Sequence, residues 1–433
     1  DKPSEPAWRA DNAGWRLFFW TAHAPLILSS GDLVYRSLTL NCIARTARHL
    51  DRSAEKAPLG LPRLVAWAGI VAASLLIPGG NPRRLFGEAG LRKAIDTAFY
   101  PDGGCICRSP LVQLDGIMLM AMLRSVYESR RETPPDYLNE ALTRTVPALL
   151  GLIHGDGGLG SWQGAAAADP LLVEAVVLAS RVRTRPLRQA RDWGYQRIAA
   201  GNSVLQVDAA PPPVARVADA GCASTGAIEL SDGPHRLIVN CGGAALAGAF
   251  IPDDLAQGLR TTAAHSTLTL AERNSTAILP DGTLGKGVTE VELNRQEIEA
   301  GSRIELSHDG YARRLGYTHR RLLLMSADGR EIRGEDMLLP SERRKKPAVT
   351  PYAVRFHLAP DVEPTLTADG QGVLLRIEMG ALWQFRAGGG AVTIEESLWV
   401  DPDGRPHATQ QIVVTGEAVP GGSSVGWLLK RVG

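Results

Sequence analysis

Residues 221–243 read GCASTGAIELSDGPHRLIVNCGG, and residues 260–270 read RTTAAHSTLTL. Within the first segment, residues 227–230 and 236–240 have the composition of short strands. Asp232-Gly233 between them predicts a two-residue hairpin turn, because glycine readily adopts the left-handed conformation that such turns require. This part of the chain therefore predicts the start of an antiparallel sheet.

The second segment places Arg260 and His265 directly before a further predicted strand, residues 266–270. A cation and an imidazole at the end of a strand are candidates for a functional site. We expect that site where a helical part and a sheet part meet, which is a common place for a ligand cleft.

The chain changes texture on either side of these segments. Residues 1–192 are mostly helical by composition, and residues 193–433 alternate in short strands separated by Asp-Gly turns. We therefore predict an α+β protein of two domains, 1–192 helical and 193–433 an antiparallel β-sandwich or sheet stack. The predicted helices are residues 15–28, 33–50, 61–77, 85–99, 111–130, 136–153 and 171–180. The clearest later strands are residues 320–325, 373–377, 391–394 and 411–415.

Composition sets limits on function. The 433 residues carry 47 Lys and Arg against 46 Asp and Glu, a formal net charge of +1, so no global field favours nucleic acid or a membrane. Five cysteines are an odd number, and none lies in a zinc-type CxxC pattern. Cys105 and Cys107 are too close for an unstrained bridge, so we expect no disulfide scaffold.

The longest apolar run, residues 64–77, is too short to span a bilayer comfortably and predicts a buried helix. The first residues lack the apolar core of a signal peptide. Together with unpaired cysteines, this favours the cytoplasm.

Two loops between the predicted helices are chemically unusual. Residues 100–110 read YPDGGCICRSP and residues 154–164 read HGDGGLGSWQG. They combine turn residues with Arg108, His154 and the sugar-stacking face of Trp162. Alternatively, their polar groups cap helix ends. Residues 341–347, SERRKKP, form a basic loop that is either solvated surface or part of an anion site.

Several motifs resemble those of the heparinase II/III-like polysaccharide lyases, and the resemblance covers nearly the whole chain. PDGGCICRSP at 101–110 resembles a PDGGH-type loop, and RTTAAHSTLTL resembles the family's RSTAAHNT segment. The stretch from 220 to 243 resembles a His-containing strand pair. HDGYARRLGYTHRR at 308–321 and YAVRFHLAPDV at 352–362 resemble further segments of a bacterial branch.

The resemblance implies an incomplete (α/α) toroid followed by antiparallel sheets, with the toroid short at its N-terminus. It implies β-elimination at a uronic acid, in which cationic groups neutralise the carboxylate and a Tyr or Tyr–His pair moves the proton. No cofactor is required. The partner is an anionic, heparin-like, heparan-like or alginate-like polysaccharide. Relatives often act in the periplasm or cell envelope, so the compartment stays open, as does the oligomeric state.

Transfer of the family's residues exposes departures. Cys105 stands at the position of the toroid-loop His or Asn, Cys222 at that of the sheet His, and Trp162 where a Tyr is expected. A neutral thiol neither stabilises a carboxylate nor acts as an acid near neutral pH. The structural zinc ligands of some relatives correspond to Ser224, Asn240 and His265, so we predict no metal there.

The remaining residues still suggest a site. His265 is the candidate acid/base or neutraliser, His154 its partner, and Tyr311 the proton-transferring phenol. The substrate-binding candidates are Arg108, Arg260, Trp162, Cys105, Cys222 and His357. Each His could instead be a buried, locally satisfied side chain, and Tyr311 could pack within the sheet. No supporting constellation is evident for His23, His49, His235, His308, His319 or His407.

Three functions are therefore weighed. The first is a lyase acting on uronic-acid-containing glycans. The second is a non-catalytic carbohydrate-binding protein on a lyase scaffold, suggested by Cys105, Cys222 and Trp162. The third is a glycoside hydrolase, which needs two facing carboxylates. Asp102 and Asp156 are the pair available for it.

Overall fold

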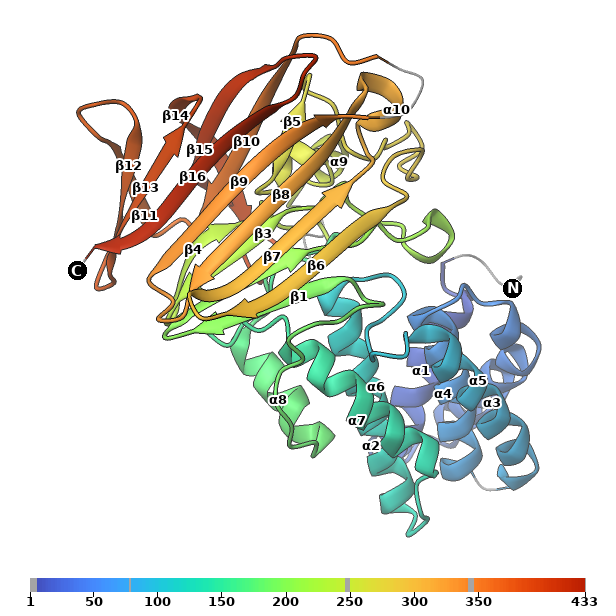
Figure 1. The fold of residues 1–433 in the computed structure, drawn as a ribbon. Coiled ribbons are helices and arrows are strands. Elements are labelled where there is room, and N and C mark those ends of the chain that lie inside the picture. The colour runs from blue at the N-terminus through green and yellow to red at the C-terminus, as the bar shows by residue number, and fades with distance from the viewer. Residues whose placement is uncertain (1–5, 78, 246–249, 342–345, 433) are drawn as a thin grey trace. The chain divides into compact units, whose positions relative to one another are not determined.

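A computed structural model describes residues 6–77, 79–245, 250–341 and 346–432 (Figure 1). The chain divides into two compact units. The helical unit comprises residues 1–107, 112–148 and 175–185. The sandwich unit comprises residues 108–111, 149–174 and 186–433.

The longer helices lie in the first part of the chain and match the predicted ones closely. They are α1 (Ala10–Ala22), α3 (Leu33–Ser53), α4 (Leu61–Leu76), α5 (Arg84–Ala98), α6 (Pro110–Ser129), α7 (Asp136–Leu150) and α8 (Pro170–Ser180), with the short α2 (Ala24–Ile27) after α1. In α3, the Asp32 carboxylate accepts hydrogen bonds from the amides of Val34 and Tyr35 at 2.8 and 3.1 Å. This N-cap fixes where the helix begins.

Helix α4 is the centre of the helical unit, and its residues from Leu64 to Leu75 are buried. Two glycines let α1 cross it closely, since a Cβ on Gly14 would lie 2.6 Å from the Val65 carbonyl oxygen and one on Gly69 would lie 2.8 Å from that of Gly14. On the other side, Gly90 of α5 lies against the Trp67 ring. The apolar run is thus a buried helix, as predicted. No helix within the described residues is long and apolar enough to cross a bilayer.

The described strands of the sandwich unit form two antiparallel sheets of eight. Sheet one runs β1-β2-β3-β4-β10-β15-β14, with β5 also paired to β10, and sheet two runs β11-β12-β13-β16-β9-β8-β7-β6. Figure 1 shows strands β16, β9, β8, β7 and β6 of sheet two side by side. The bounds in sheet one are β1 Tyr195–Ala200, β2 Ser203–Asp208, β3 Ile228–Asp232, β4 His235–Val239, β5 Leu268–Leu270, β10 Thr350–Leu358, β14 Ala391–Val400 and β15 Pro406–Ala418. Those in sheet two are β6 Val291–Ile298, β7 Gly301–His308, β8 Tyr317–Ser326, β9 Glu331–Pro340, β11 Val362–Leu366, β12 Gly372–Ile377, β13 Leu382–Gly388 and β16 Ser423–Val432. Two short helices, α9 (Asp253–Gly258) and α10 (Ala312–Leu315), lie in the connections.

Strand β8 shows how the sandwich is built, because every second residue from Tyr317 to Met325 is buried. This is the period of a strand with one face in the core. Leu323 and Met325 pack there with residues of both sheets, among them Phe356 of β10 and Phe385 of β13. The two sheets therefore share one apolar core.

The sequence prediction of N-terminal helices followed by a two-sheet antiparallel stack is confirmed. The hairpin prediction needs one correction. Asp232 is still paired with His235, so the two turn residues are Gly233 and Pro234, with Gly233 at a φ of 55°. The toroid and the 192/193 boundary stay predictions. Most of the basic loop at 341–347 lies outside the described residues.

Candidate functional site

One face of β2 and β3 carries polar side chains that are completely buried. Gln206, Asp208, Glu229 and Ser231 have no exposed surface. They contact Arg108 and the segment 154–163, both of which belong to the sandwich unit. We call this group, together with Arg108, His154, Gln163, Ser224 and Asn240, the buried polar layer. Buried polar groups must be paired to be tolerated, so their partners decide what chemistry they can do.

Arg108 lies at one end of the layer and is 2% exposed. Its Nη2 donates to the Asp208 carboxylate at 2.6 Å, and its Nε to the Trp193 carbonyl at 2.7 Å. Its Nη1 donates to the Pro211 carbonyl at 2.9 Å, and the guanidinium lies 4.7 Å from the centre of the Tyr195 ring. The guanidinium is therefore engaged by the protein itself.

The other Asp208 oxygen joins the layer to Cys222. It accepts hydrogen bonds from Ser224 Oγ at 2.6 Å and Gln163 Nε2 at 3.2 Å, and Gln163 Oε1 accepts from the Cys222 amide at 2.8 Å. Burial raises the pKa of the Cys222 thiol to about 12. The thiol is thus neutral at physiological pH.

His154 lies between a serine and a carboxylate. Its Nδ1 is 3.0 Å from Ser231 Oγ, which accepts a hydrogen bond from the Gly155 amide, and its Nε2 is 2.9 Å from Glu229 Oε2. Burial lowers the pKa of His154 despite the Glu229 contact. The neutral ring therefore accepts at Nδ1 from Ser231 and donates its Nε2–H to Glu229. Both side chains are almost fully enclosed.

Glu229 links His154 to the RTTAAHSTLTL segment. Its Oε1 accepts from the Ser161 amide at 3.0 Å and from Asn240 Nδ2 at 2.9 Å. The Asn240 side-chain oxygen in turn accepts from the Ser266 amide at 3.0 Å. Asn240 thus acts as a neutral connector between two chain segments.

Three predicted site residues that come after Asn240 in the sequence are also buried: Arg260, His265 and His357. His265 Nδ1 donates to the Thr261 carbonyl at 2.7 Å, and burial lowers the pKa of the ring. Arg260 donates from Nε to the Gly221 carbonyl at 2.9 Å and from Nη1 to Gln257 and to the Gly282 carbonyl. His357 bridges Ser397 Oγ and the Ala263 carbonyl, and burial lowers its pKa to about 3.

Three predicted site residues remain: Tyr311, Trp162 and Cys105. Tyr311 is in the sandwich core, donates to the Leu268 carbonyl at 2.9 Å, and has its pKa raised by burial. Trp162 has no exposed surface, and its Nε1 donates to Gln206 at 3.1 Å. Cys105 belongs to the helical unit, where its amide donates to Gln113 Oε1 at 2.7 Å.

The structure thus places Arg108, His154, Trp162 and Cys222 at one buried polar layer, beside partners that sequence reasoning missed, chiefly Gln163, Asp208 and Glu229. Each of the predicted residues is at most 5% exposed.

A second buried constellation was also missed. His308 Nε2 lies 3.0 Å from His319 Nδ1, and His319 Nε2 lies 2.7 Å from Asp336 Oδ1. Arg321 holds both Asp336 oxygens at 2.7 and 3.0 Å. We call these four residues the histidine–aspartate chain. The spacing of His319 and Arg321 on β8 could have revealed it, because alternate strand residues share one face.

No group of three or more His, Cys, Asp or Glu side chains within the described residues is arranged to hold a metal ion. At the positions that correspond to zinc ligands, Ser224, Asn240 and His265 each make the local hydrogen bonds given above. For the hydrolase reading, burial alone would raise the pKa of Asp156, but the charge and hydrogen bond of Arg236, 2.7 Å away, outweigh burial and lower it. An ionised Asp156 is a poor general acid.

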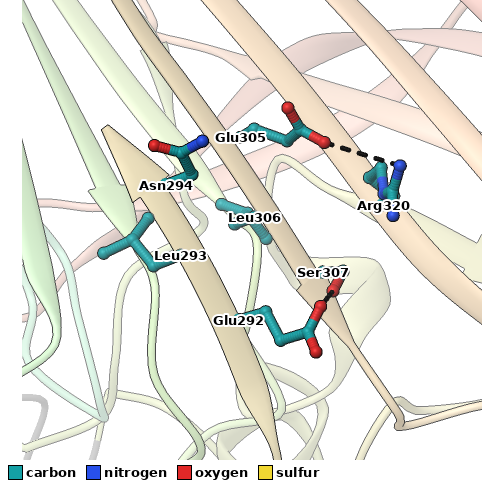
Figure 2. A pocket seen from close by; sticks show the side chains of 7 residues that line it. All are labelled: Glu292, Leu293, Asn294, Glu305, Leu306, Ser307 and Arg320. Atoms are coloured by element: carbon teal, nitrogen blue, oxygen red, sulfur yellow. Dashed lines mark hydrogen bonds and ion pairs between the residues drawn. The ribbon is translucent and has the colours of Figure 1, made fainter. Parts of the chain in front are cut away.

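Among the hollows on sheet two and its connections, two differ in how their charged groups are paired. The one in Figure 2 has a volume of about 140 Å³ on β6, β7 and β8. Its charged groups face partners, since Glu305 pairs with Arg320 at 3.5 Å and Glu292 accepts from Ser307 at 3.1 Å. The other, about 730 Å³, lies between residues 274–289 and 309–314 and is lined by Lys286, Arg313 and Arg314.

The fold and the motifs agree with one family. Residues 182–428 match the family described as heparinase II/III-like, C-terminal, and the chain belongs to the heparinase II/III-like family.

Among curated proteins it is similar to FtsZ-localized protein C of Caulobacter vibrioides, with 29% identity over 446 aligned residues that cover 98% of this chain and 76% of that protein.

Solved structures of similar fold include heparinase III, with a TM-score of 0.78, 14% identity and coverage of 100% of this chain and 71% of that one. The heparan sulfate lyase HepC of Pedobacter heparinus has a TM-score of 0.70 and 16% identity, covering 98% of this chain and 68% of its own. At these identities the likeness shows the fold.

Proposed function

We propose that this chain is a heparinase II/III-like protein that binds acidic polysaccharide without cleaving it. One observation supports this above all. The sandwich-unit side chains that would neutralise a uronate or move its proton are buried, and Arg108, His154, His265 and Tyr311 each make hydrogen bonds within the protein. A general acid or base must come within hydrogen-bond reach of the substrate.

The protonation states support the same conclusion. A lyase phenol must ionise or share its proton in the transition state, yet burial raises the pKa of Tyr311 and the hydroxyl is held by a carbonyl. A neutral Cys222 thiol offers no positive charge to a uronate carboxylate. Arg108 could reach a carboxylate only by leaving Asp208 buried and unpaired, which is strongly unfavourable.

The test is incubation with heparin, heparan sulfate, alginate and polygalacturonate. Absorbance of the new C4–C5 double bond and new reducing ends are followed alongside equilibrium binding. Binding without either product is expected. Turnover with new absorbance would overturn the proposal in favour of the lyase, and reducing ends alone would favour hydrolysis.

Family membership favours the lyase as the second candidate. If elimination is observed, we expect His265→Ala to abolish it and Cys222→Ala to leave it unchanged. Equal activity of the His265→Ala protein would exclude His265 as the acid/base. Melting temperature and circular dichroism of both variants separate lost chemistry from lost folding.

A third candidate is a partner role at FtsZ. The relative from Caulobacter vibrioides is named for its location with FtsZ, and it is 29% identical over nearly this whole chain. Co-sedimentation with FtsZ polymers is the direct test. Recovery of the chain in the pellet only when FtsZ is polymerised would support this role.

A further inference from the structure

We infer that the 730 Å³ hollow is the glycan site of the sandwich unit, and that it takes an acidic sugar through Lys286, Arg313 and Arg314. The inference deepens the proposed function and depends on it. The hollow is open to solvent and lies among residues 274–289 and 309–314. Its volume is within the usual range for small-ligand sites, about 300–1,000 Å³.

The charge of the hollow favours an anion. Lys286, Arg313 and Arg314 are all exposed, and none has an ion-pair partner among the residues that the structure describes. Its carboxylate, Asp309, already accepts from the Thr289 amide at 2.8 Å, from the Thr289 hydroxyl at 2.7 Å and from the Glu290 amide at 3.1 Å. Asp309 therefore organises the wall, and the three cations remain to face a ligand.

The lining also contains the apolar side chains of Ala277, Leu279 and Val288, which we call the apolar wall. A ligand that uses both the cations and the apolar wall needs a ring with a C–H face and anionic substituents. A uronate or sulfated sugar has both, and arginine and lysine bind carboxylate and sulfate oxygens through charge-assisted hydrogen bonds. A bare inorganic anion would leave the apolar wall unused.

The hollow is held open by its framework. Residues 277–286 form a hairpin in which the amides of Ala277 and Gly285 bond to the carbonyls of Lys286 and Ala277 at 3.1 and 2.7 Å. Gly310 brings the opposite turn close, because a Cβ there would lie 2.7 Å from the Ser275 carbonyl oxygen. The buried Tyr311 hydroxyl, bonded to Leu268, anchors the start of α10 and so positions Arg313 and Arg314.

The test is calorimetric titration of the full chain with a heparin hexasaccharide, a galacturonate hexamer and neutral maltohexaose. The test variant is Lys286→Gln/Arg313→Gln/Arg314→Gln. The control is Arg376→Gln/Arg405→Gln/Lys430→Gln, which removes three exposed, ion-paired cations elsewhere on the same unit, with side chains 76%, 59% and 57% exposed. Vesicles containing phosphatidylglycerol form a further arm.

We expect the wild type and the control to bind at least one acidic hexasaccharide and to ignore maltohexaose. The test variant should bind at least about tenfold more weakly, the effect of losing a single charge-assisted contact. Wild-type affinity in the test variant would refute this site while leaving glycan binding intact. Failure of the wild type to bind either acidic sugar would overturn both proposals. Vesicle binding that depends on the three cations, without sugar binding, would assign the hollow to phosphate headgroups instead.

Discussion

The Nε2 atom of His308 lies 3.0 Å from the Nδ1 atom of His319 in the interior of the sandwich unit. The Gly310 amide donates to His308 Nδ1 at 3.2 Å, so the His308 proton is on Nε2 and points at His319. His319 then carries its own proton on Nε2, where it donates to Asp336. Both rings are neutral, and each donates its Nε2 proton to the next group, His308 to His319 and His319 to Asp336.

Acid should therefore destabilise the protein before most of its carboxylates titrate, with Asp115, whose pKa burial raises to about 6, acting in the opposite direction. Burial lowers the pKa of His308, His319 and His154 below the ordinary value. The unfolded chain then binds more protons below about pH 6.5, and each such histidine removes about 1.4 kcal/mol of unfolding free energy per pH unit. Urea unfolding at about pH 7.5 and about pH 5.5 should show the loss.

The titration of Asp336 does not contribute to the difference in unfolding free energy between these two pH values. Its folded pKa is lowered, with Arg321 and His319 outweighing burial, so its contribution is lost only as the pH falls below about 3.9. In the His308→Gln variant, the loss of unfolding free energy per pH unit should be smaller than in the wild type. In the His23→Gln variant, which changes an exposed histidine, it should match the wild type. Equal stability at both pH values would contradict the neutral assignment.

Ring tautomers can be read directly. The hydrogen-bond pattern assigns the proton to Nε2 in His154, His308, His319 and His357, and to Nδ1 in His265. Long-range proton–nitrogen correlation spectra of histidine-labelled protein, at a pH where the rings are neutral, distinguish the two forms. An Nδ1–H signal assigned to His308 would show that its bond to the Gly310 amide is wrong.

Removing one member of the Arg108–Asp208 pair should be costly. Arg108→Met leaves a buried carboxylate without its cation and should lower the unfolding free energy by about 3–5 kcal/mol. Asp208→Asn added to it should recover part of the loss, since the amide is uncharged and can still bond to Ser224. Denaturant titration of the single and double variants measures both effects.

The matched control is the exposed pair of Arg376 and Glu363. Arg376→Met should cost less than about 1 kcal/mol, because such pairs are solvated and screened. If Arg108→Met cost no more than this control, Asp208 would have to be neutral or hydrated in the folded protein.

Thiol reactivity should sort the cysteines by burial. Cys42 is exposed and should react rapidly with an aromatic disulfide reagent, Cys107 is partly exposed and should react more slowly, and Cys105, Cys222 and Cys241 are buried. Burial also raises the pKa of Cys241 to about 11 and that of Cys222 to about 12, which suppresses the reactive thiolate. In the native protein, Cys42→Ser should remove the fast phase, and a fast phase that persists would place a second thiol at the surface.

Much of the fold was predictable from local patterns. The apolar run of α4 and the alternation of β8 specify a buried helix and a one-sided strand without any knowledge of their neighbours. The hairpin turn lies one residue later than predicted, and a bulge between Leu230 and Ser231 shifts the register of the two strands beyond it. Local sequence does not encode such a bulge clearly.

The site was harder to predict because its pairs are distant along the chain. Arg108 and Asp208 are 100 residues apart, and His154 and Glu229 are 75 apart. Composition singled out the arginine and the histidine, which are unusual in their loops. Asp208 and Glu229 are embedded in strands that resemble ordinary buried runs. From the sequence, only Arg108 and His154 could be singled out. Without their partners Asp208 and Glu229 in view, they resembled free catalytic groups.

Arg321 reaches across the sandwich. While its Nε and Nη2 hold Asp336 of β9, its Nη1 donates to the carbonyls of Gly226 and Ser266 beside sheet one, at 2.8 and 2.9 Å. Arg321 therefore links the two sheets at this point. Separating them would leave a charged side chain without its hydrogen-bond partners. In native-state hydrogen exchange, amides of β3, β5, β8 and β9 should share one opening energy and behave as a single cooperative block.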